Sequence, residues 1–331
     1  MNTGSAGRRI LITGASSGIG FAAASRLLGA GHRLCLPCRN AATAAALRQR
    51  LGGSIQTPLC NLADLASVAH AAEHLLAAGE PIDTLVLNAG LQYSGAGEPR
   101  WSAQGFELTL AVNHLAHQAL LQRLLPLLRQ GREPRLVITA SEVHDPASPG
   151  GRVGQPAGLG DLGGLRRGPG AAMLAGHTPF NAEKAYKDSK LCNLLMAREL
   201  ARRLRQRGIS LPVLAWSPGL VIPRGREGFF RHSRRHNPLG QAVFALLARD
   251  LLRLTASAEQ AGALLADLAA GPLASPTGFQ YWSNRVIAPG RLRFEPTEAS
   301  AEARNGSLAE ELWTLSAAQL GLDPEHGLAG P

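Results

Sequence analysis

Short apolar runs rich in β-branched residues alternate along this chain with longer stretches, rich in Ala and Leu, that have helical periodicity. This alternation is typical of a parallel sheet whose strands are joined by crossover helices. Strands are predicted at residues 9–13, 33–37, 55–59, 84–87, 136–139, 211–216 and 278–283. We therefore expect one α/β domain over residues 1–331, built on a doubly wound parallel sheet of about seven strands with helices on both faces.

Two segments interrupt this pattern. Residues 145–180 are dense in Gly and Pro, and so long a loop predicts either a functional lid or a disordered insertion. Residues 220–254 follow the sixth strand and are predicted to form a substrate loop. Both segments leave the carboxyl ends of strands, where open α/β sheets bind their ligands. His144 and His177 flank the insertion, and we interpret both as ordinary loop residues, with substrate contact as the alternative.

Composition places the chain among compact globular proteins and excludes a linker or a tail. It has 331 residues, of which 45% are hydrophobic and 18% are charged. The N-terminal residues lack the apolar segment of a secretory signal, and no apolar run reaches the roughly 18 residues of a membrane span. We expect a soluble, cytoplasmic protein that contacts an internal membrane at most peripherally.

Four cysteines are too few for a disulfide framework in a chain of this length, and they indicate a reducing compartment. Cys35 and Cys38 have C-x-x-C spacing, but they lie at the end of a predicted strand and no second pair completes a zinc site. We interpret them as structural and expect no metal site. Cys192, on a predicted helix, is interpreted as a small buried hydrophobic residue.

The formal net charge of +10 would by itself favour nucleic acid or an anionic membrane as a partner. Most arginines, however, are spread singly along helical stretches, and only 5% of the residues are aromatic, so we expect no nucleic-acid partner. One denser basic patch lies in the substrate loop and contains Arg224, Arg226, Phe229, Phe230, Arg231, His232, Arg234, Arg235 and His236. Either it forms a solvated or membrane-surface helix, or it recognises an anionic, largely apolar substrate.

A glycine-rich turn follows the first strand and precedes a helix predicted to begin near Phe21. Gly14 allows the tight turn, Gly18 lets the backbone approach a pyrophosphate, and Gly20 lets the helix pack closely on the sheet. The free N–H groups and the positive dipole end of the helix favour phosphates. The candidate cofactor residues of this turn are Gly14, Ser16, Ser17, Gly18, Ile19 and Gly20.

The TGxxxGxG spacing of this turn resembles that of the short-chain dehydrogenase/reductase family, and further family landmarks follow in the same order. They are Asn88, Ala89 and Gly90 after the fourth strand, Asn113 in a helix, Ser141 after the fifth strand, the YxxxK pair Tyr186 and Lys190, and Pro218 and Gly219 after the sixth strand. The resemblance implies a Rossmann-type fold in which residues 88–90 border the adenine ribose. It also implies that Pro218, Gly219 and Val221 lie beside the nicotinamide.

Tyr186 and Lys190 are four residues apart, so a helix places them on the same face. A phenol is a poor acid at neutral pH, but a nearby ammonium and a positively charged nicotinamide favour its phenolate. Tyr186 is therefore the candidate proton donor or acceptor. The resemblance implies that Ser141 hydrogen-bonds the reacting oxygen and that Asn113 holds a water connecting Lys190 to solvent.

The chain contains only three lysines, Lys184, Lys187 and Lys190, and all lie within seven residues around Tyr186. A compact ammonium whose pKa can be tuned suits this position, where a guanidinium would not fit. We interpret the cluster as an independent sign of chemistry at Tyr186, the alternative being an ordinary amphipathic helix.

Cofactor preference is indicated by the residues after the second strand, where an acid would bind the ribose 2′-hydroxyl of NAD and a base the 2′-phosphate of NADP. Arg39 stands there, with no acidic residue beside it. We predict NADP(H) as the cofactor, with Arg39 on the 2′-phosphate. After the third strand, Asn61 and Leu62 replace the family's more usual Asp-Leu and are predicted to border the adenine.

The second half of the chain is similar to the protochlorophyllide-reductase-like branch of the family. The similarity lies in the AYKDSK stretch, the LGDL motif at 159–162 within a long insertion, the CRN sequence after the second strand and the late YWS strand. It implies that NADPH gives hydride and Tyr186 gives a proton to a large apolar substrate such as a tetrapyrrole, using absorbed light. Leu220, however, stands where that branch has a cysteine, and residues 140–146 are closer to carbonyl-reducing and retinol-dehydrogenase-like relatives.

Two alternative functions follow from these departures and from the cofactor motifs. One is a light-independent carbonyl or retinol-type reductase that uses the same catalytic residues. The other is a non-catalytic NADP-binding sensor, which the presence of all four catalytic candidates disfavours.

Overall fold

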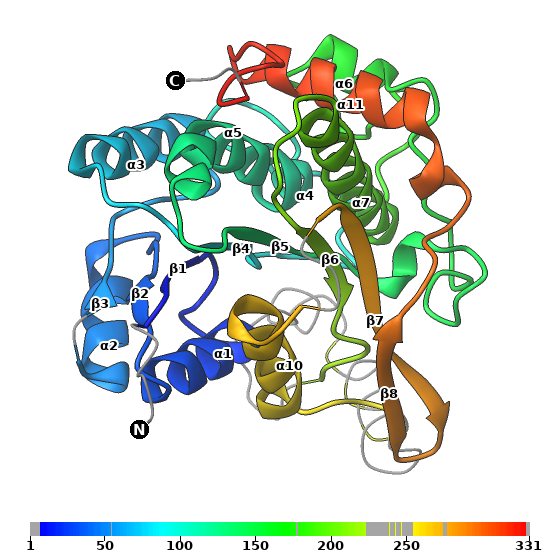
Figure 1. Cartoon of the computed structure of the whole chain (residues 1–331). Coiled ribbons are helices and arrows are strands. Elements are labelled where there is room, and N and C mark those ends of the chain that lie inside the picture. Colours follow the sequence, from blue (N-terminus) through cyan, green and yellow to red (C-terminus); the bar gives the residue numbers. More distant parts are fainter. Residues whose placement is uncertain are drawn as a thin grey trace.

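The computed structural model describes residues 7–53, 55–176, 178–222, 254–273 and 277–328, together with Pro238, Ala242 and Leu246. Its centre is one sheet of eight strands in the order β3-β2-β1-β4-β5-β6-β7-β8 (Figure 1). The strands are β1 (Arg9–Ile12), β2 (Arg33–Cys35), β3 (Ile55–Gln56), β4 (Thr84–Leu87), β5 (Arg135–Thr139), β6 (Val213–Ser217), β7 (Phe279–Ala288) and β8 (Arg291–Pro296). Strands β1 to β7 are all parallel to one another, and β8 runs antiparallel to β7.

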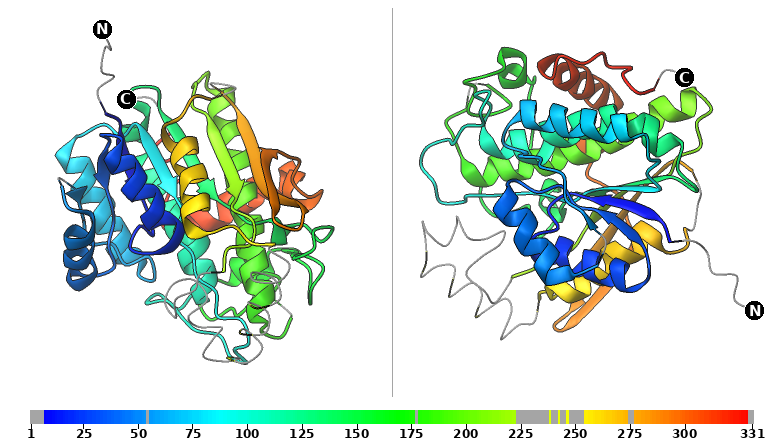
Figure 2. Two further views of the ribbon diagram at one scale, coloured as in Figure 1. Left: turned by 90° about the horizontal axis from the view of Figure 1, so that it is seen from below. Right: turned by 90° about the vertical axis from the view of Figure 1, so that its left-hand side faces the viewer.

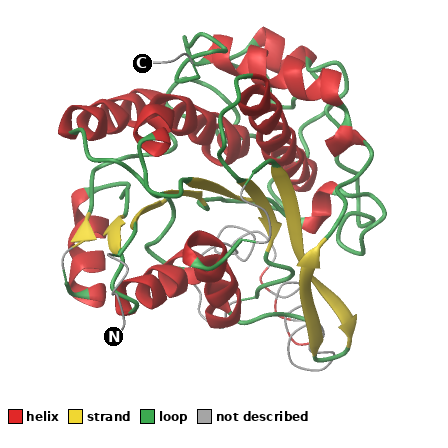
Figure 3. Cartoon of the chain, viewed as in Figure 1, coloured by secondary structure: helices red, strands yellow, loops and turns green. Residues whose placement is uncertain are grey.

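Helices cover both faces of this sheet (Figures 1 and 3). One layer holds α3 (Leu65–Ala78), α5 (Ala116–Arg129), α7 (Ala182–Gln206) and α11 (Gly306–Gln319), and the other holds α1 (Gly18–Gly29), α2 (Ala41–Leu51) and α10 (Ala258–Ala270). The shorter turns are α4 (Leu108–Leu110), the π turn η1 (Ala111–Leu115), η2 (Glu142–His144), α6 (Gly163–Arg167) and η4 (Glu302–Arg304). The expected doubly wound, Rossmann-type architecture is confirmed, and no helix in the described part of the chain is long and apolar enough to cross a membrane.

The central strands are buried on both faces, and their residues alternate between two apolar cores. In β1, Ile10 and Ile12 belong to the core beneath α1 and α10, two helices that pack side by side (Figure 2). Leu11 belongs to the core on the opposite face, beneath α3, α5 and α7. Strand β4 repeats the alternation with Val86 on the first side and Leu85 on the second. This burial on both faces explains why the strands appear in the sequence as continuous apolar runs.

The sheet contains one strand more than the sequence predicts. Strand β7 continues beyond the predicted end at residue 283 as far as Ala288, and the chain then turns back through Pro289 and Gly290 into β8. The β8 sequence, RLRFEP, alternates Arg with apolar residues and ends in Pro, which is typical of an exposed edge strand. Strand β3 is shorter than predicted, because Pro58 has no N–H to donate to a continuing ladder.

The insertion 145–180 is packed where the structure describes it, over residues 145–176 and 178–180. It contains α6, and Leu159, Leu162 and Leu165 are each at most 1% exposed within the core beneath α5 and α7. The Gln319 amide of α11 donates to the Leu165 carbonyl at 3.0 Å. Of the two alternatives for this segment, a disordered insertion is therefore wrong for the described residues, since burying apolar side chains offsets the entropy cost of ordering them.

The substrate loop 220–254 is described only at residues 220–222, 238, 242, 246 and 254. The basic patch with Phe229 and Phe230 lies outside the described residues, as does His177. At the start of the loop, the Leu220 carbonyl accepts a hydrogen bond from the Ala256 N–H at 2.9 Å, which returns the chain toward α10.

Candidate active site

The turn between β1 and α1 has a shape that depends on glycine. Gly14 has φ = 71°, and a Cβ at this position would lie 2.7 Å from Cα of Ala89. A Cβ at Gly20 would lie 2.4 Å from the Gly14 carbonyl oxygen, so side chains are excluded at both positions. Ser17 and Gly18 are exposed, and the Ser17 side chain does not cap α1. The N-terminus of α1 is thus open to an anionic ligand, as the motif predicts.

Thr13 joins this turn to the turn after β4. Its hydroxyl oxygen accepts the N–H groups of Asn88 (2.9 Å) and Ala89 (3.0 Å), and the Asn88 amide donates to the Thr13 carbonyl (3.1 Å). Thr139, at the end of β5, donates its hydroxyl to Asn88 Oδ1 at 3.3 Å. These bonds fix the ends of three neighbouring strands to one another, so the two cofactor motifs lie side by side.

Arg39 and Asn61 follow the neighbouring strands β2 and β3 at the same carboxyl edge of the sheet. The Arg39 side chain is exposed. Asn61 Oδ1 accepts the Ala63 N–H at 3.2 Å and so shapes its own turn, while Leu62 is partly buried against the core. The structure thus leaves Arg39 exposed at this edge of the sheet, whereas Asn61 stabilises its own turn.

Strand β6 ends in a turn that packs on β7. Gly219 has φ = 74°, and a Cβ there would lie 2.5 Å from the Asn284 carbonyl oxygen. The Asn284 amide also donates to the Pro218 carbonyl at 3.1 Å. Pro218, Gly219 and Val221 therefore lie beyond the carboxyl end of β6, beside the end of β5 that carries Ser141.

Arg50 is one of the arginines that are spread singly along helical stretches of the sequence. In the structure its guanidinium lies 3.8 Å from the centre of the Phe21 ring and donates to the Ser16 carbonyl at 2.9 Å. Arg50 thus supports the glycine turn from α2. The sequence gives no signal for this contact, because a cation in the last turn of a helix is already favoured by the helix dipole.

Helix α7 carries both Tyr186 and Lys190, as their spacing predicts. The Lys190 ammonium lies 5.7 Å from the centre of the Tyr186 ring and donates to the Thr139 carbonyl at 3.0 Å. Lys190 is 2% exposed, and this burial lowers its pKa to about 8. A Cβ at Gly90 would lie 3.5 Å from Lys190 Nζ, so the turn after β4 approaches the ammonium closely.

Ser141 follows β5 and hydrogen-bonds the Tyr186 hydroxyl. Burial raises the pKa of Tyr186 above its ordinary value, and the bond to Ser141, which favours the phenolate, offsets this only in part. Tyr186 is therefore protonated at neutral pH, which is the state needed to give a proton. Strand β5 and helix α7 thus bring Ser141, Tyr186 and Lys190 together.

Asn113 lies fully buried in η1, a single π turn at the start of α5, and such turns are frequent at functional sites. Its Oδ1 accepts the Leu91 N–H (2.8 Å), and its amide donates to the Leu91 carbonyl (3.0 Å) and to Ser189 Oγ (3.0 Å). Its backbone carbonyl accepts from His117 Nδ1 at 3.1 Å. Asn113 therefore ties the segment after Gly90 to α7, while its role in holding a water stays a prediction.

The three lysines divide between different faces of α7. Lys190 lies beside Tyr186, whereas Lys184 and Lys187 donate to backbone carbonyls of residues 151–158 in the insertion. The interpretation of the whole cluster as chemistry at Tyr186 is therefore wrong for two of its three members. Lys184 and Lys187 thus contact residues about 30 positions away in the sequence, and no local sequence pattern predicts such contacts.

His144 and Cys192 are structural. His144 is 2% exposed; its Nδ1–H donates to the Ser141 carbonyl (2.7 Å), and its Nε2 accepts the Ser300 N–H (3.2 Å). Burial lowers its pKa, so a neutral ring holds the backbone of Ser141. Cys192 has no exposed surface, and burial raises its pKa, as expected of a buried hydrophobic residue. Cys35 and Cys38 are likewise buried and unpaired.

Comparison with known proteins gives matches over both halves of the chain. A model described as short chain dehydrogenase matches residues 8–153. The chain is 36% identical over 325 residues to protochlorophyllide reductase A, chloroplastic, of Oryza sativa subsp. japonica, covering 95% of this chain and 80% of that protein. It is 33% identical over 320 residues to protochlorophyllide reductase, chloroplastic, of Chlamydomonas reinhardtii, covering 94% and 77%. These similarities extend well past residue 153, into the part that carries Tyr186 and Lys190.

Solved structures with the same architecture are also found. A putative uncharacterized protein from Mycobacterium paratuberculosis has a TM-score of 0.67 and 25% identity, covering 96% of this chain and 94% of that chain. The RhlG/NADP active-site complex of Pseudomonas aeruginosa has a TM-score of 0.60 and 27% identity, covering 86% and 96%.

Proposed function

Because this chain belongs to the short-chain dehydrogenase/reductase family, and there to the protochlorophyllide-reductase-like branch, we propose that it reduces a large apolar substrate of the tetrapyrrole class. It is an oxidoreductase that depends on NADP(H). The observation that carries the proposal is the cluster of Ser141, Tyr186 and Lys190, residues that flank the packed insertion in the sequence. Sites for large apolar ligands are lined mainly by apolar side chains, which the insertion can supply.

The residues at the carboxyl edge of the sheet fit this cofactor. The open N-terminus of α1 offers backbone N–H groups at Gly18 and Ile19 to a pyrophosphate. Arg39 is exposed where a 2′-phosphate would bind, with no acidic neighbour in the sequence to repel it. When bound, NADPH supplies the hydride.

The protein's own residues supply the proton and control it. Tyr186, kept protonated by burial, gives the proton from its hydroxyl, and the hydrogen bond from Ser141 orients that hydroxyl toward the substrate. The Lys190 ammonium then stabilises the phenolate that remains. The Thr139 carbonyl holds Lys190 in place for this role.

Light distinguishes the two candidate reductases. We expect the purified enzyme with NADPH to convert protochlorophyllide to a red-shifted product only after illumination, with the unilluminated mixture as control and NADH as a poorer donor. A light-independent carbonyl or retinol-type reductase is the second candidate, favoured by Leu220 and by residues 140–146. Absence of pigment product after illumination, together with NADPH oxidation in the dark on a panel of aldehydes that includes retinal, would establish the second candidate instead.

The lowered pKa of Lys190 predicts the pH dependence of the reaction. The ammonium is present below pH about 8 and is lost above it, whereas Tyr186 stays protonated over this range. We expect kcat/KM for the cofactor, which reports the free enzyme, to fall by about tenfold per pH unit above that pKa. Steady-state rates between pH 6 and 10 measure this, and Lys190→Met should be slower but free of the alkaline decline. A wild-type profile that stays flat to pH 9.5 would contradict a role for the Lys190 charge.

A further inference from the structure

Helix α7 carries two sets of functional side chains on different faces. Tyr186 and Lys190 form one set at a spacing of four, and Lys184, Lys187 and Asp188 form the other at spacings of three and four. The second set is buried, with exposed fractions of 8%, 5% and 1%. Burying charged groups is costly unless each is paired and hydrogen-bonded, so the contacts of these side chains indicate their purpose.

Lys187 is enclosed by backbone carbonyls of the insertion. Its ammonium donates to the carbonyl oxygens of Gly151 (3.0 Å), Val153 (2.5 Å) and Gln155 (2.9 Å). An ammonium has three N–H donors, and the insertion accepts all three. The alternate carbonyls of residues 151–155 thus converge on one side chain of the catalytic helix.

Lys184 and Asp188 hold the next part of the insertion. The Lys184 ammonium bonds both Asp188 oxygens (2.8 and 2.7 Å) and the Gly158 carbonyl (2.6 Å), while Asp188 Oδ1 accepts the Gly158 N–H (2.9 Å). Glu302, from η4, accepts the following N–H, that of Leu159, at 3.0 Å. Both backbone groups of Gly158 are therefore fixed by side chains of α7.

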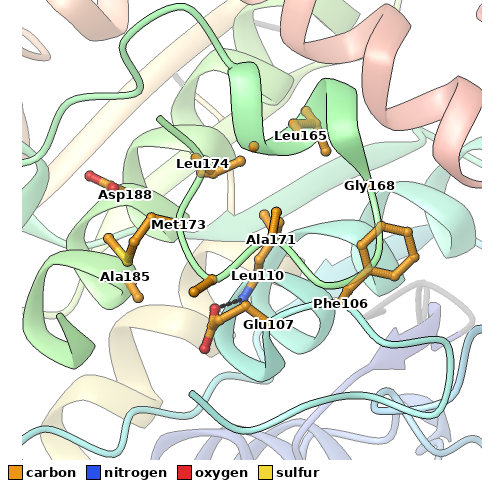
Figure 4. Close-up of a pocket in the computed structure, with 12 residues that line it drawn as sticks. Phe106, Glu107, Leu110, Leu165, Gly168, Ala171, Met173, Leu174, Ala185 and Asp188 are labelled. Atoms are coloured by element: carbon orange, nitrogen blue, oxygen red, sulfur yellow. Dashed lines mark hydrogen bonds between the residues drawn. The ribbon is translucent and has the colours of Figure 1, made fainter. Parts of the chain in front are cut away.

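The second half of the insertion packs on the same helix by apolar contact. Figure 4 shows it over α4 and the start of α7, with a narrow pocket between them. The apolar side chains that line this pocket include Phe106, Leu110, Leu165, Met173, Leu174 and Ala185. These apolar contacts support the second half of the insertion against α4 and the start of α7.

We propose that Lys187, with the Lys184–Asp188 pair, positions residues 151–159 as a preformed wall of the substrate site. The inference rests on the proposed function, because it assigns this wall to the large substrate reduced at Tyr186. The insertion begins soon after Ser141 and ends just before α7, and Val153 in its held segment exposes 72% of an apolar side chain. Because the wall is ordered before the substrate binds, the binding free energy is not reduced by the entropy cost of ordering these residues.

Lys187→Met tests the proposal, with Arg205→Met as the matched control because Arg205 is an exposed cation on the same helix. In Lys187→Met we expect the substrate KM to rise about tenfold, whereas kcat and the NADPH Kd should each change by less than about twofold. The reason is that the wall contributes to substrate binding and not to proton transfer. Amide hydrogen exchange over residues 151–158 should accelerate about tenfold or more without substrate. Arg205→Met should leave all four quantities unchanged. Asp188→Asn, which keeps an acceptor for Gly158 but loses the charge, should act in the same direction with a smaller effect.

The outcomes separate this inference from the proposed function. If the wild-type enzyme does not reduce the pigment, the proposed function is wrong, and so is the assignment of the wall to that substrate. Hydrogen exchange would still decide whether Lys187 holds the insertion. Unchanged exchange and unchanged substrate KM in a Lys187→Met variant that binds NADPH normally would overturn the inference. A kcat that falls in parallel with NADPH affinity would also overturn it, because that result indicates general loss of structure.

Discussion

Replacement of Tyr186 by Phe is expected to lower kcat by about 10²–10⁴-fold, because the substitution removes the group that gives the proton. The Phe ring keeps the shape and leaves the Lys190 ammonium beside it, 5.7 Å from the ring centre in the native protein. The NADPH Kd should therefore change little, since the glycine turn and Arg39 lie on other strands. Product formation under constant illumination and NADPH fluorescence titration measure the two quantities.

Tyr93→Phe is the matched control for loss of a buried tyrosine hydroxyl. The Tyr93 hydroxyl donates to Glu107 Oε1 at 2.5 Å and accepts the Arg100 N–H at 3.1 Å. Its loss should lower the free energy of unfolding by about 1–3 kcal/mol and change kcat by less than about twofold. If Tyr186→Phe retained wild-type turnover, the proton would come from another group and the mechanism proposed above would be wrong.

The second large effect is expected for Gly14→Ala in the cofactor turn. The φ of 71° disfavours any side chain, and the new Cβ would lie 2.7 Å from backbone Cα of Ala89, which cannot rotate away. We expect the free energy of unfolding to fall by about 2–4 kcal/mol and NADPH binding to weaken by about tenfold or more. Urea denaturation and fluorescence titration measure these changes.

Gly29→Ala gives the corresponding control. Gly29 is the last residue of α1, and no heavy atom lies within 4 Å of the Cβ that alanine would add. Alanine is the better helix former, so stability should stay equal or rise by up to about 1 kcal/mol, with unchanged NADPH affinity. Equal behaviour of the Gly14 and Gly29 variants would mean that the turn does not need its left-handed conformation.

The features that the sequence predicts are those encoded by local spacing. The strands β1 and β4 to β6 are apolar runs of the right length, and the glycine turn follows from three positions within seven residues. Tyr186 and Lys190 share a face because helical geometry alone places them there. For these parts no knowledge of distant contacts is needed.

The features that the sequence does not predict depend on partners far along the chain. Lys187 has the same residue type and nearly the same position as Lys190, yet its partners lie 32 to 36 residues upstream. Arg50 reaches a carbonyl 34 residues away, and no periodicity distinguishes it from a solvated arginine. Strand β8 pairs with the edge of β7, and nothing within its own six residues shows that this partner is present.

Within the part of the chain that the structure describes, the ammonium of Lys187 donates to backbone oxygens alone, and every amino acid supplies a backbone oxygen. The side chains of residues 152, 153 and 155 are exposed and play no part in that attachment. Mutations there can consequently accumulate without moving the segment. The backbone position of the wall is therefore independent of the side chains that the wall exposes. Such an arrangement makes the insertion a natural place for related enzymes, or a designed library, to explore new substrates at little cost in folding.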